Sequence, residues 1–513
     1  MRDVDKMDSR VTNTRRNIVA SYLLMIIQTV FSFISKSVIV YTLGSEFLGL
    51  SSLFNSILTV LNVAEMGFTT SIVFFMYKPL AEGNTKRVCA LLAYLKKVYR
   101  IVGIVILTLG VVLAFFLPWL INGNVPESTN VYVLYFLYLI NTTVSYFLYA
   151  YKTALLTAIQ RLDLTKIVSC IVSVVQYSLQ LIALIVFHNY YLFVLAMVLG
   201  TAFTNISAGY ISDHFYPQYK CYGEISNEDK NAIIGKVKGL LICNISIVTY
   251  STLDNIVISS FIGLTAVAIY ANYMTIYKAV NQLVLMIRSA MQSSVGNSIA
   301  NETIDKNLHD VFLWQFLFTV IATWCASCMI CLFQPFMKLW MGDDMLLPIA
   351  DVALIVTWFF IDIVQQAHFL YLNGAGMWND MKYSYIFNTG CNLILNVLLG
   401  KFWGITGILI ASLVTCIISG TFWQCIIIFR NYFKSSAREY IVTQIRYFAI
   451  GVFVVLISYG SARVASFNFN GIFELVIRFA VCSITTIVCL LLVYGRNVYF
   501  SDSVALAKRT FHH

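Results

Sequence analysis

The stretch YSTLDNIVISSFIGLTAVAIYANYMTI, residues 250–276, joins two apolar segments at a glycine and carries one ionisable residue, Asp254. Each segment continues far enough to cross a membrane, since about 20 apolar residues rising 1.5 Å each span about 30 Å of hydrocarbon. Similar runs recur along nearly the whole chain, which is 59% hydrophobic and 11% charged. Soluble domains have roughly 25% charged residues. The sequence therefore predicts an all-α polytopic membrane protein.

Alternation of apolar runs with polar breaks gives the number of helices. The first run is too long for the apolar core of a signal peptide, so we expect an uncleaved first span. The pattern predicts fourteen transmembrane helices, at residues 17–42, 47–77, 98–120, 130–151, 166–188, 190–212, 239–262, 265–297, 311–334, 349–372, 383–400, 405–429, 441–463 and 472–494.

The basic residues give the orientation of these helices. Of the 34 Lys and Arg, 27 fall in segments that this topology places on one side: 1–16, 78–100, 151–166, 213–238, 301–310, 373–382, 430–446 and 495–513. Loops on the other side hold only Lys338, Lys401 and Arg463. The positive-inside rule then predicts that both chain termini are cytoplasmic. The net charge of +10 follows the topology, so we expect no nucleic-acid partner.

The quoted stretch has a weak counterpart near the start of the chain. SKSVIVYTLGSEFLGLSSLFNSI, residues 35–57, aligns with residues 254–276 at a constant offset of 219 residues, so that Gly44 faces Gly263. Transporters built from such repeats place their site at the repeat interface. We therefore predict two six-helix lobes with two further helices: 1–212 as the N-lobe, 213–238 as a cytoplasmic loop, 239–430 as the C-lobe, and 431–513 as the last two helices and a cytoplasmic tail.

Several charges lie deep in the predicted spans. Counted at 1.5 Å per residue from the outer ends, Asp254 lies about 12 Å deep, Lys278 and Asp362 about 20 Å, Glu65 about 27 Å and Lys36 about 9 Å. A charge at a helix centre costs at least about 2.5–3.5 kcal/mol, so it normally faces a bundle interior or a water-filled cavity. A neutralising pair, such as Lys278 with Asp254 or Asp362, is one interpretation. Lys36 could also extend its side chain to the interface.

The eighth predicted span has one polar and cationic face. At 100° per residue, a single stripe contains Tyr270, Met274, Tyr277, Lys278, Asn281, Arg288 and Gln292. The stripe could pack against another polar helix or line a cavity, and the cavity is favoured. A cationic cavity would attract a phosphate or diphosphate. The predicted substrate-binding residues are Lys278, Arg288, Lys36, Asn281, Tyr277 and Gln292.

Signatures of enzymes and of bound metals are missing from the sequence. It has no G-x-x-x-x-G-K-[ST] loop and no H-E-x-x-H motif, so we expect neither catalytic residues nor an ATP site. Cys325, Cys328 and Cys331 lie in an apolar run without other ligands, so we expect core packing rather than a metal site or cofactor. The predicted coupling or gating residues are Asp254, Glu65 and Asp362, whose carboxylates could bind Na⁺ or H⁺.

Five stretches carry a family resemblance: RRNIVASYLLMIIQTVFSFISKSVIVYTLG at 15–44, LNVAEMGFTTSIVFFMYKPLAEGN at 61–84, LLTAIQRLDLTK at 155–166, STLDNIVISSFIGLTAVAIYANYMTIYKAV at 251–280 and LNGAGMWND at 372–380. In their order and span positions they resemble the Wzx-type polysaccharide flippases of the multidrug/oligosaccharidyl-lipid/polysaccharide exporter superfamily, abbreviated MOP. The resemblance covers nearly the whole chain.

The resemblance implies a transporter of the bacterial cytoplasmic membrane. Its substrate would be an undecaprenyl-diphosphate-linked oligosaccharide repeat unit, moved to the outer leaflet by alternating access of two lobes and used for O-antigen in lipopolysaccharide, capsule or exopolysaccharide. By analogy with lipid II flippases, the last two helices would guide the polyprenyl tail. Membrane lipids and polysaccharide polymerase are the expected partners.

Two other functions remain open at this stage. A drug or metabolite antiporter of the same superfamily would need a cavity dominated by carboxylates and apolar residues, and the cations of the eighth span argue against it. A membrane-embedded glycan polymerase or ligase would need a large outer loop, whereas the longest outer segments have about a dozen residues.

Overall fold

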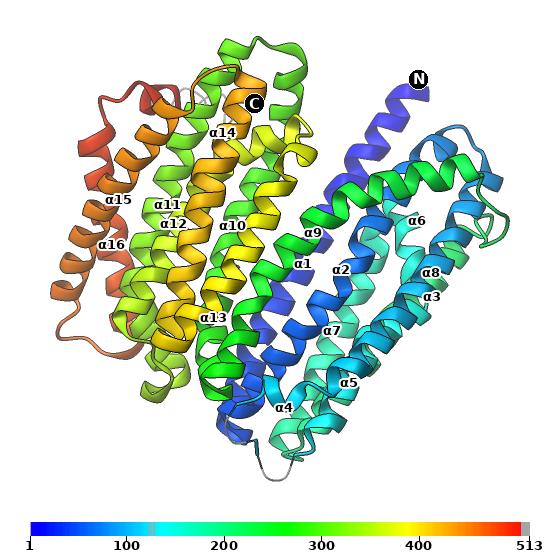
Figure 1. Ribbon diagram of the computed structural model, residues 1–513, viewed down its shortest axis with the longest axis horizontal. Helices are drawn as coiled ribbons and strands as arrows, with labels where there is room; N and C mark the ends of the chain where they lie inside the picture. The colour runs from blue at the N-terminus through cyan, green and yellow to red at the C-terminus, as the bar shows by residue number, and fades with distance from the viewer. Residues whose placement is uncertain (1, 123–124, 127–128, 504–513) are drawn as a thin grey trace. The chain divides into compact units, whose positions relative to one another are not determined.

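The chain folds into helices joined by short turns (Figure 1). The computed structural model describes residues 2–122, 125–126 and 129–503, with side chains from Arg16 onward except at a few helical positions. No strand occurs among these residues. The predicted all-α class is thereby confirmed.

Two compact units divide the chain, Met1–Ala268 (unit 1) and Ile269–His513 (unit 2). In unit 1, α2 packs against α9 and α3, α7 packs against α1 and α8, and α5 packs against α3 and α8. Its elements are α1 (Arg2–Leu43), α2 (Ser45–Ala81), α3 (Thr85–Ala114), α4 (Leu117–Leu120), α5 (Val131–Phe147), η1 (Ala150–Lys152), α6 (Thr153–Ala158), α7 (Leu162–Ile185), α8 (Tyr190–Phe215), α9 (Asn227–Phe261) and the start of α10 (Leu264–Asn301).

Unit 2 is centred on α11, which packs against α12, α15 and α16. Its elements after α10 are α11 (Ile304–Met341), η2 (Asp343–Met345), α12 (Ile349–Gly374), α13 (Trp378–Cys416), the π-helix η3 (Ile417–Gln424), α14 (Cys425–Ile428), the π-helix η4 (Phe429–Phe433), α15 (Arg438–Ala465) and α16 (Gly471–Tyr494). The boundary between the units lies inside α10, after α9. The two six-helix lobes stay a prediction.

Polar caps fix where several helices begin. A side-chain oxygen of the residue before the helix accepts a hydrogen bond from a backbone N–H of the first turn in α3, α5, α8, α9 and α11. The capping residues are Asn84, Asn130, Asn189, Ser226 and Thr303. Because Ser226 caps α9 inside the predicted loop 213–238, this helix begins earlier than its apolar run.

Ten of the described helices are long and apolar enough to cross a membrane, and a bent pair, Val131–Phe147 with Ala150–Ala158, would add another. One of the ten, Trp378–Phe433, contains the predicted spans 383–400 and 405–429. The non-helical backbone of Gly404, with φ of 59°, breaks it between them. A residue with a side chain rarely adopts this conformation, which explains the glycine at the turn.

The two glycines aligned by the sequence repeat adopt similar backbone conformations. Gly44 precedes α2 with φ of 105°, and Gly263 precedes α10 with φ of 127°. Beside the second turn, α2 approaches so closely that a Cβ on Gly49 would lie 2.2 Å from the Leu264 carbonyl oxygen. Both turns therefore contain a glycine with a positive φ, and Gly49 leaves room for α2 to pack against the second turn.

The cysteine-rich stretch of α11 contributes to the packing of α15 and α16. Cys331 is fully buried and packs with Ala462 of α15 and Cys482 of α16. A second cluster, with Phe316 at its centre, joins the same three helices. The last two helices are thus held by buried contacts along α11.

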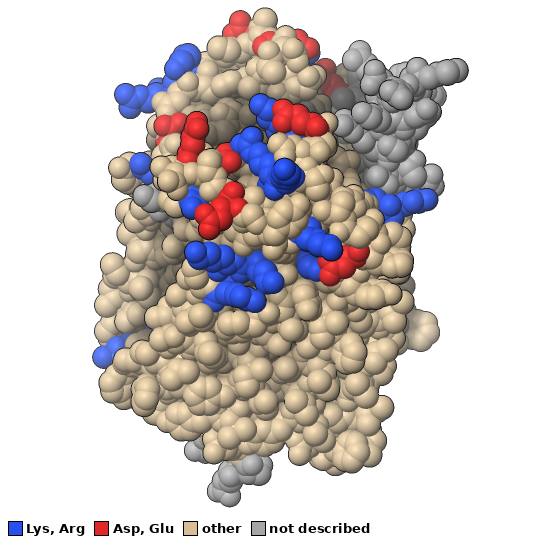
Figure 2. Space-filling view, turned by 90° about the vertical axis from the view of Figure 1, so that its right-hand side faces the viewer, with Lys and Arg blue, Asp and Glu red and all other residues tan. Residues whose placement is uncertain are grey.

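One face of the molecule has an uneven distribution of charged residues. Figure 2 shows a face on which most of the Lys, Arg, Asp and Glu gather toward one end, while a broad uncharged surface covers the rest. Such a surface is what helices present to lipid, because hydrocarbon cannot solvate charges. The fold is that of a multi-pass membrane protein.

Candidate functional site

The polar face of α10 meets a carboxylate on α12. The Asn281 amide donates a hydrogen bond of 2.6 Å to Asp362 Oδ2, and the Tyr277 hydroxyl donates one of 3.2 Å to the same oxygen. Both donors are buried, with Tyr277 7% and Asn281 8% exposed. The Asp362 carboxylate is therefore stabilised by neutral groups of the neighbouring helix.

The contact continues along both helices. Arg288 Nη1 donates to Gln366 Oε1 at 2.6 Å, and Gln366 Nε2 donates to the Asp362 carbonyl oxygen at 2.9 Å. One further step along α10, Gln292 Nε2 donates to the Leu370 carbonyl oxygen at 3.1 Å. Residue numbers increase together on the two helices, so α10 and α12 run in the same direction at this contact.

We call this contact the polar seam and define it by Tyr277, Asn281, Arg288, Gln292, Asp362 and Gln366. Four of its members belong to the stripe that the sequence assigned to substrate binding, and all four donate to α12. Lys278 of the same stripe is exposed and Arg288 is half-buried. The seam thus combines the half-buried Asp362 carboxylate with the Arg288 guanidinium, and the exposed Lys278 lies on the same helix as Arg288.

The remaining predicted cation and one predicted carboxylate lie in unit 1. Lys36 on α1 is half-buried, and Asp254 on α9 is 4% exposed. Next to Asp254, Asn255 Nδ2 donates a 2.9 Å hydrogen bond to Ser56 Oγ on α2. Lys36 therefore belongs to a different unit from Lys278 and Arg288.

Glu65 lies in a network of oxygen atoms on α2, α3 and α5. Its Oε1 accepts hydrogen bonds from Thr69 Oγ1, at 2.7 Å, and from the Tyr99 hydroxyl. The Tyr146 hydroxyl lies 3.4 Å from Glu65 Oε2 and 3.2 Å from Asn62 Oδ1. In the part of the chain that the structure describes, no Lys or Arg forms a salt bridge with Glu65. Among the described residues, the hydroxyl groups of Thr69, Tyr99 and Tyr146 contact this carboxylate.

Sequence reasoning identified the carboxylates and missed most of their partners. Gln366 follows Asp362 by four residues, a spacing that places both on one helix face, so the pattern could have indicated it. Tyr99 and Tyr146 are 34 and 81 residues from Glu65. No local signal connects residues so far apart.

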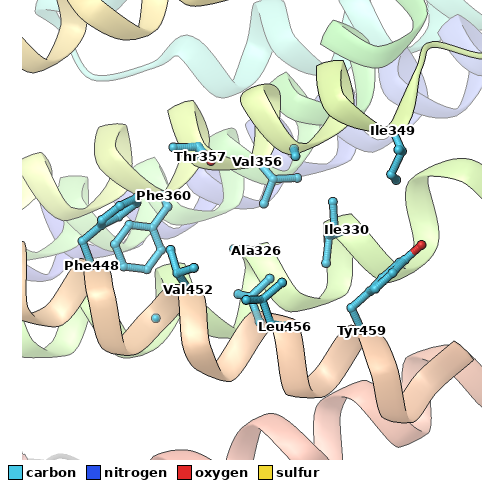
Figure 3. A pocket seen from close by; sticks show the side chains of 13 residues that line it. Ala326, Ile330, Ile349, Val356, Thr357, Phe360, Phe448, Val452, Leu456 and Tyr459 are labelled. Atoms are coloured by element: carbon cyan, nitrogen blue, oxygen red, sulfur yellow. The ribbon is translucent and has the colours of Figure 1, made fainter.

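An apolar cavity of about 260 Å³ lies between α11, α12 and α15 (Figure 3). Phe360 and Phe448 contact each other edge to face at one end, and Ile349 and Tyr459 lie at the other. A Cβ on Gly451 would lie 2.8 Å from the Phe360 ring, so the absence of a side chain at this position leaves room for that ring. The cavity suits hydrocarbon rather than polar groups.

No protein-family model and no curated protein sequence matches the chain. Solved structures do match it. The chain is similar to the lipid II flippase MurJ in an inward closed conformation, with a TM-score of 0.68 and 13% identity, over 93% of this chain and 99% of the flippase.

Two further similar structures are MATE transporters. A multidrug resistance MATE family transporter of the MOP superfamily, in an inward-facing conformation, has a TM-score of 0.62 and 14% identity over 84% of this chain and 99% of its own. The Vibrio cholerae MATE transporter VcmN, in a bent form, has a TM-score of 0.52 and 15% identity over 86% and 99%. The chain therefore has the fold that a lipid II flippase and MATE transporters share.

Proposed function

We propose that this protein is a flippase for undecaprenyl-diphosphate-linked oligosaccharide repeat units. It would move them from the cytoplasmic to the outer leaflet of the bacterial cytoplasmic membrane by alternating access. The observation that carries the proposal is the cationic face of α10, a helix that the sequence predicts to span the membrane, where Lys278 is exposed and Arg288 is half-buried. Lysine and arginine side chains on one helix face attract phosphate groups, and a diphosphate is such a group.

The apolar cavity beside α15 supports the same proposal. A polyprenyl tail needs a hydrocarbon surface along its path, and each buried CH₂ group contributes about 0.8 kcal/mol. The match to the lipid II flippase also extends over 93% of this chain, against 84% for the inward-facing MATE transporter. We assign the tail to the cavity lined by α11, α12 and α15.

Coupling or gating is the role we propose for Asp254, Glu65 and Asp362. A carboxylate repels a diphosphate, so these residues suit a cation better than the substrate. The Glu65 network surrounds its carboxylate with hydroxyl and amide oxygens, the ligand type that Na⁺ or a proton would use. The driving force would then be an ion gradient.

A drug or metabolite antiporter is the second candidate, because MATE transporters share the fold. The two functions differ in what accumulates when the gene is deleted. A flippase deletion strain should accumulate lipid-linked oligosaccharide on the cytoplasmic face of the membrane. An antiporter deletion strain should instead become more sensitive to a toxic compound and keep normal surface polysaccharide.

The direct test complements the deletion strain with Lys278→Ala and Arg288→Ala. Loss of one charged hydrogen bond to the diphosphate, about 1.5–3 kcal/mol, should lower export roughly tenfold to hundredfold. Surface polysaccharide is measured together with the amount of protein in the membrane. Lys401→Ala is the matched control, since Lys401 is an exposed lysine outside α10. Normal export by both the Lys278→Ala and the Arg288→Ala variant would refute the assignment.

A further inference from the structure

Two exposed cations, Lys97 and Arg100, lie on α3 at the end that the sequence predicts to be cytoplasmic. They continue a stripe of exposed apolar side chains on the same helix, which consists of Ile101, Ile104, Val105, Val111 and Val112. Lys97 precedes Ile101 by four residues and Arg100 precedes Ile104 by four, so the cations and the stripe share one helix face. A continuous apolar face of this kind is what a helix presents to lipid. Lys97 and Arg100 therefore lie where the hydrocarbon ends.

Neither cation is neutralised by the residues around it. The salt bridges at this end of α3 and on the adjoining η1 use other cations, namely Arg87 with Asp229 and Lys152 with Asp213. Among the described residues, Lys97 and Arg100 form no salt bridge. Side chains three residues apart on a helix have Cβ atoms about 5–6 Å apart, so both cations can reach one phosphate group. Two positive charges therefore remain for an anion.

The end of α5 brings aromatic rings to the same place. A Cβ on Gly103 would lie 3.3 Å from the ring of Phe147, the last residue of α5. Because Gly103 follows Arg100 by three residues, the exposed Phe147 ring lies close to the cationic pair. The chain then bends by 48° into Ala150–Ala158, most of which is buried. Tyr149, at the bend, is exposed as well, and tyrosine is enriched at the headgroup level of membranes.

The distribution of charge on this side of unit 1 agrees with that depth. α3 lies toward the right of Figure 1, on the side that faces the viewer in Figure 2. There, Lys and Arg side chains border the broad uncharged surface. Basic side chains at the border of a lipid-facing surface are within reach of phospholipid phosphates.

Charge and apolar surface together select the class of ligand. Arginine and lysine both bind phosphate, arginine through a planar fork of donors and lysine as a point charge. A free phosphate ion would use only the cations, whereas a phospholipid would also cover the apolar stripe. A zwitterionic headgroup carries its own cation, which competes with Lys97 and Arg100 for the phosphate. An anionic phospholipid fits both features of the surface.

We propose that Lys97 and Arg100 bind the headgroup phosphate of an anionic phospholipid, whose acyl chains lie along the apolar stripe of α3. The site belongs to unit 1 and uses none of the residues proposed for substrate binding or coupling. It does not depend on what the protein transports, and its test measures binding rather than transport.

The test is native mass spectrometry of the full-length protein from detergent, titrated with phosphatidylglycerol or with phosphatidylcholine of the same acyl chains. The wild type should bind phosphatidylglycerol more tightly. Lys97→Gln and Arg100→Gln should each weaken this binding about fivefold, and the double variant about twenty-five-fold. Lys86→Gln is the matched control and should bind like the wild type, because Lys86 is exposed on the same helix but lies about 16 Å further from the stripe than Lys97.

The proposal fails if the wild type binds the two lipids equally, or if the double variant binds phosphatidylglycerol as tightly as Lys86→Gln does. Equal weakening by Lys86→Gln and Arg100→Gln would reduce the site to diffuse attraction by a basic surface and would also overturn it. Displacement of the lipid by millimolar inorganic phosphate would assign the cations to a free ion instead. Arg100→Lys keeps the charge and should retain most of the affinity, and a loss as large as in Arg100→Gln would contradict a charge contact. Melting temperatures of all variants verify that each is folded.

Discussion

Replacing Asp362 with alanine removes the acceptor to which Asn281 and Tyr277 donate at 2.6 Å and 3.2 Å. Each hydrogen bond to a charged group contributes about 1.5–3 kcal/mol, and each buried donor left without a partner costs about 1–3 kcal/mol. Removing the half-buried charge also removes the cost of its desolvation, which offsets part of this loss. We therefore expect Asp362→Ala to destabilise the protein by about 2–4 kcal/mol.

A double-mutant cycle isolates the central contact of the seam. Combining Asp362→Ala with Asn281→Ala should give a coupling energy of about 1.5–3 kcal/mol. The reason is that Asn281→Ala causes little further loss of stability once its acceptor Asp362 has been removed. Stability is measured by unfolding of the purified protein in mixed micelles. The two residues lie in unit 2, so one transition reports on both.

The control cycle uses an exposed pair. Lys78 and Glu82 lie 3.8 Å apart at the end of α2, with side chains 79% and 50% exposed. Their coupling should be about 0.3–0.5 kcal/mol, as for other exposed pairs four residues apart on a helix. If the Asp362–Asn281 coupling were no larger than this value, the seam would not hold α10 against α12 and the reasoning would be refuted.

Two other substitutions test contacts within unit 1. Gly49→Ala places a methyl group 2.2 Å from the Leu264 carbonyl oxygen, so it should lower the stability by about 1–3 kcal/mol and with it the melting temperature. Gly235 has open space around it, so Gly235→Ala should be neutral or slightly stabilising. Equal effects at the two glycines would contradict the close approach. Glu65→Gln keeps the side chain's shape and removes its charge, so transport should be lost while the protein stays in the membrane. Glu82→Gln, at the residue that follows α2, is the control. Unimpaired transport in Glu65→Gln would exclude Glu65 from coupling.

The sequence predicts the helices well where a membrane span and a helix coincide. The predicted spans 166–188 and 472–494 correspond to α7 (Leu162–Ile185) and α16 (Gly471–Tyr494). Apolar runs locate such helices because each segment is stabilised by burial in lipid independently of the other segments. The ends of longer helices depend on caps and on packing outside the hydrocarbon. For that reason α10 continues past its predicted end at residue 297 to Asn301.

The sequence by itself determined the class of protein, the spans and the residues whose charge is costly in lipid, since each of these follows from local composition. Only the tertiary structure decided what each charge contacts. It joined Asp362 to Asn281 and Tyr277, and it surrounded Glu65 with tyrosines 34 and 81 residues away. Periodicity fixes the face on which a residue lies, whereas the choice of the facing helix depends on packing along the whole chain.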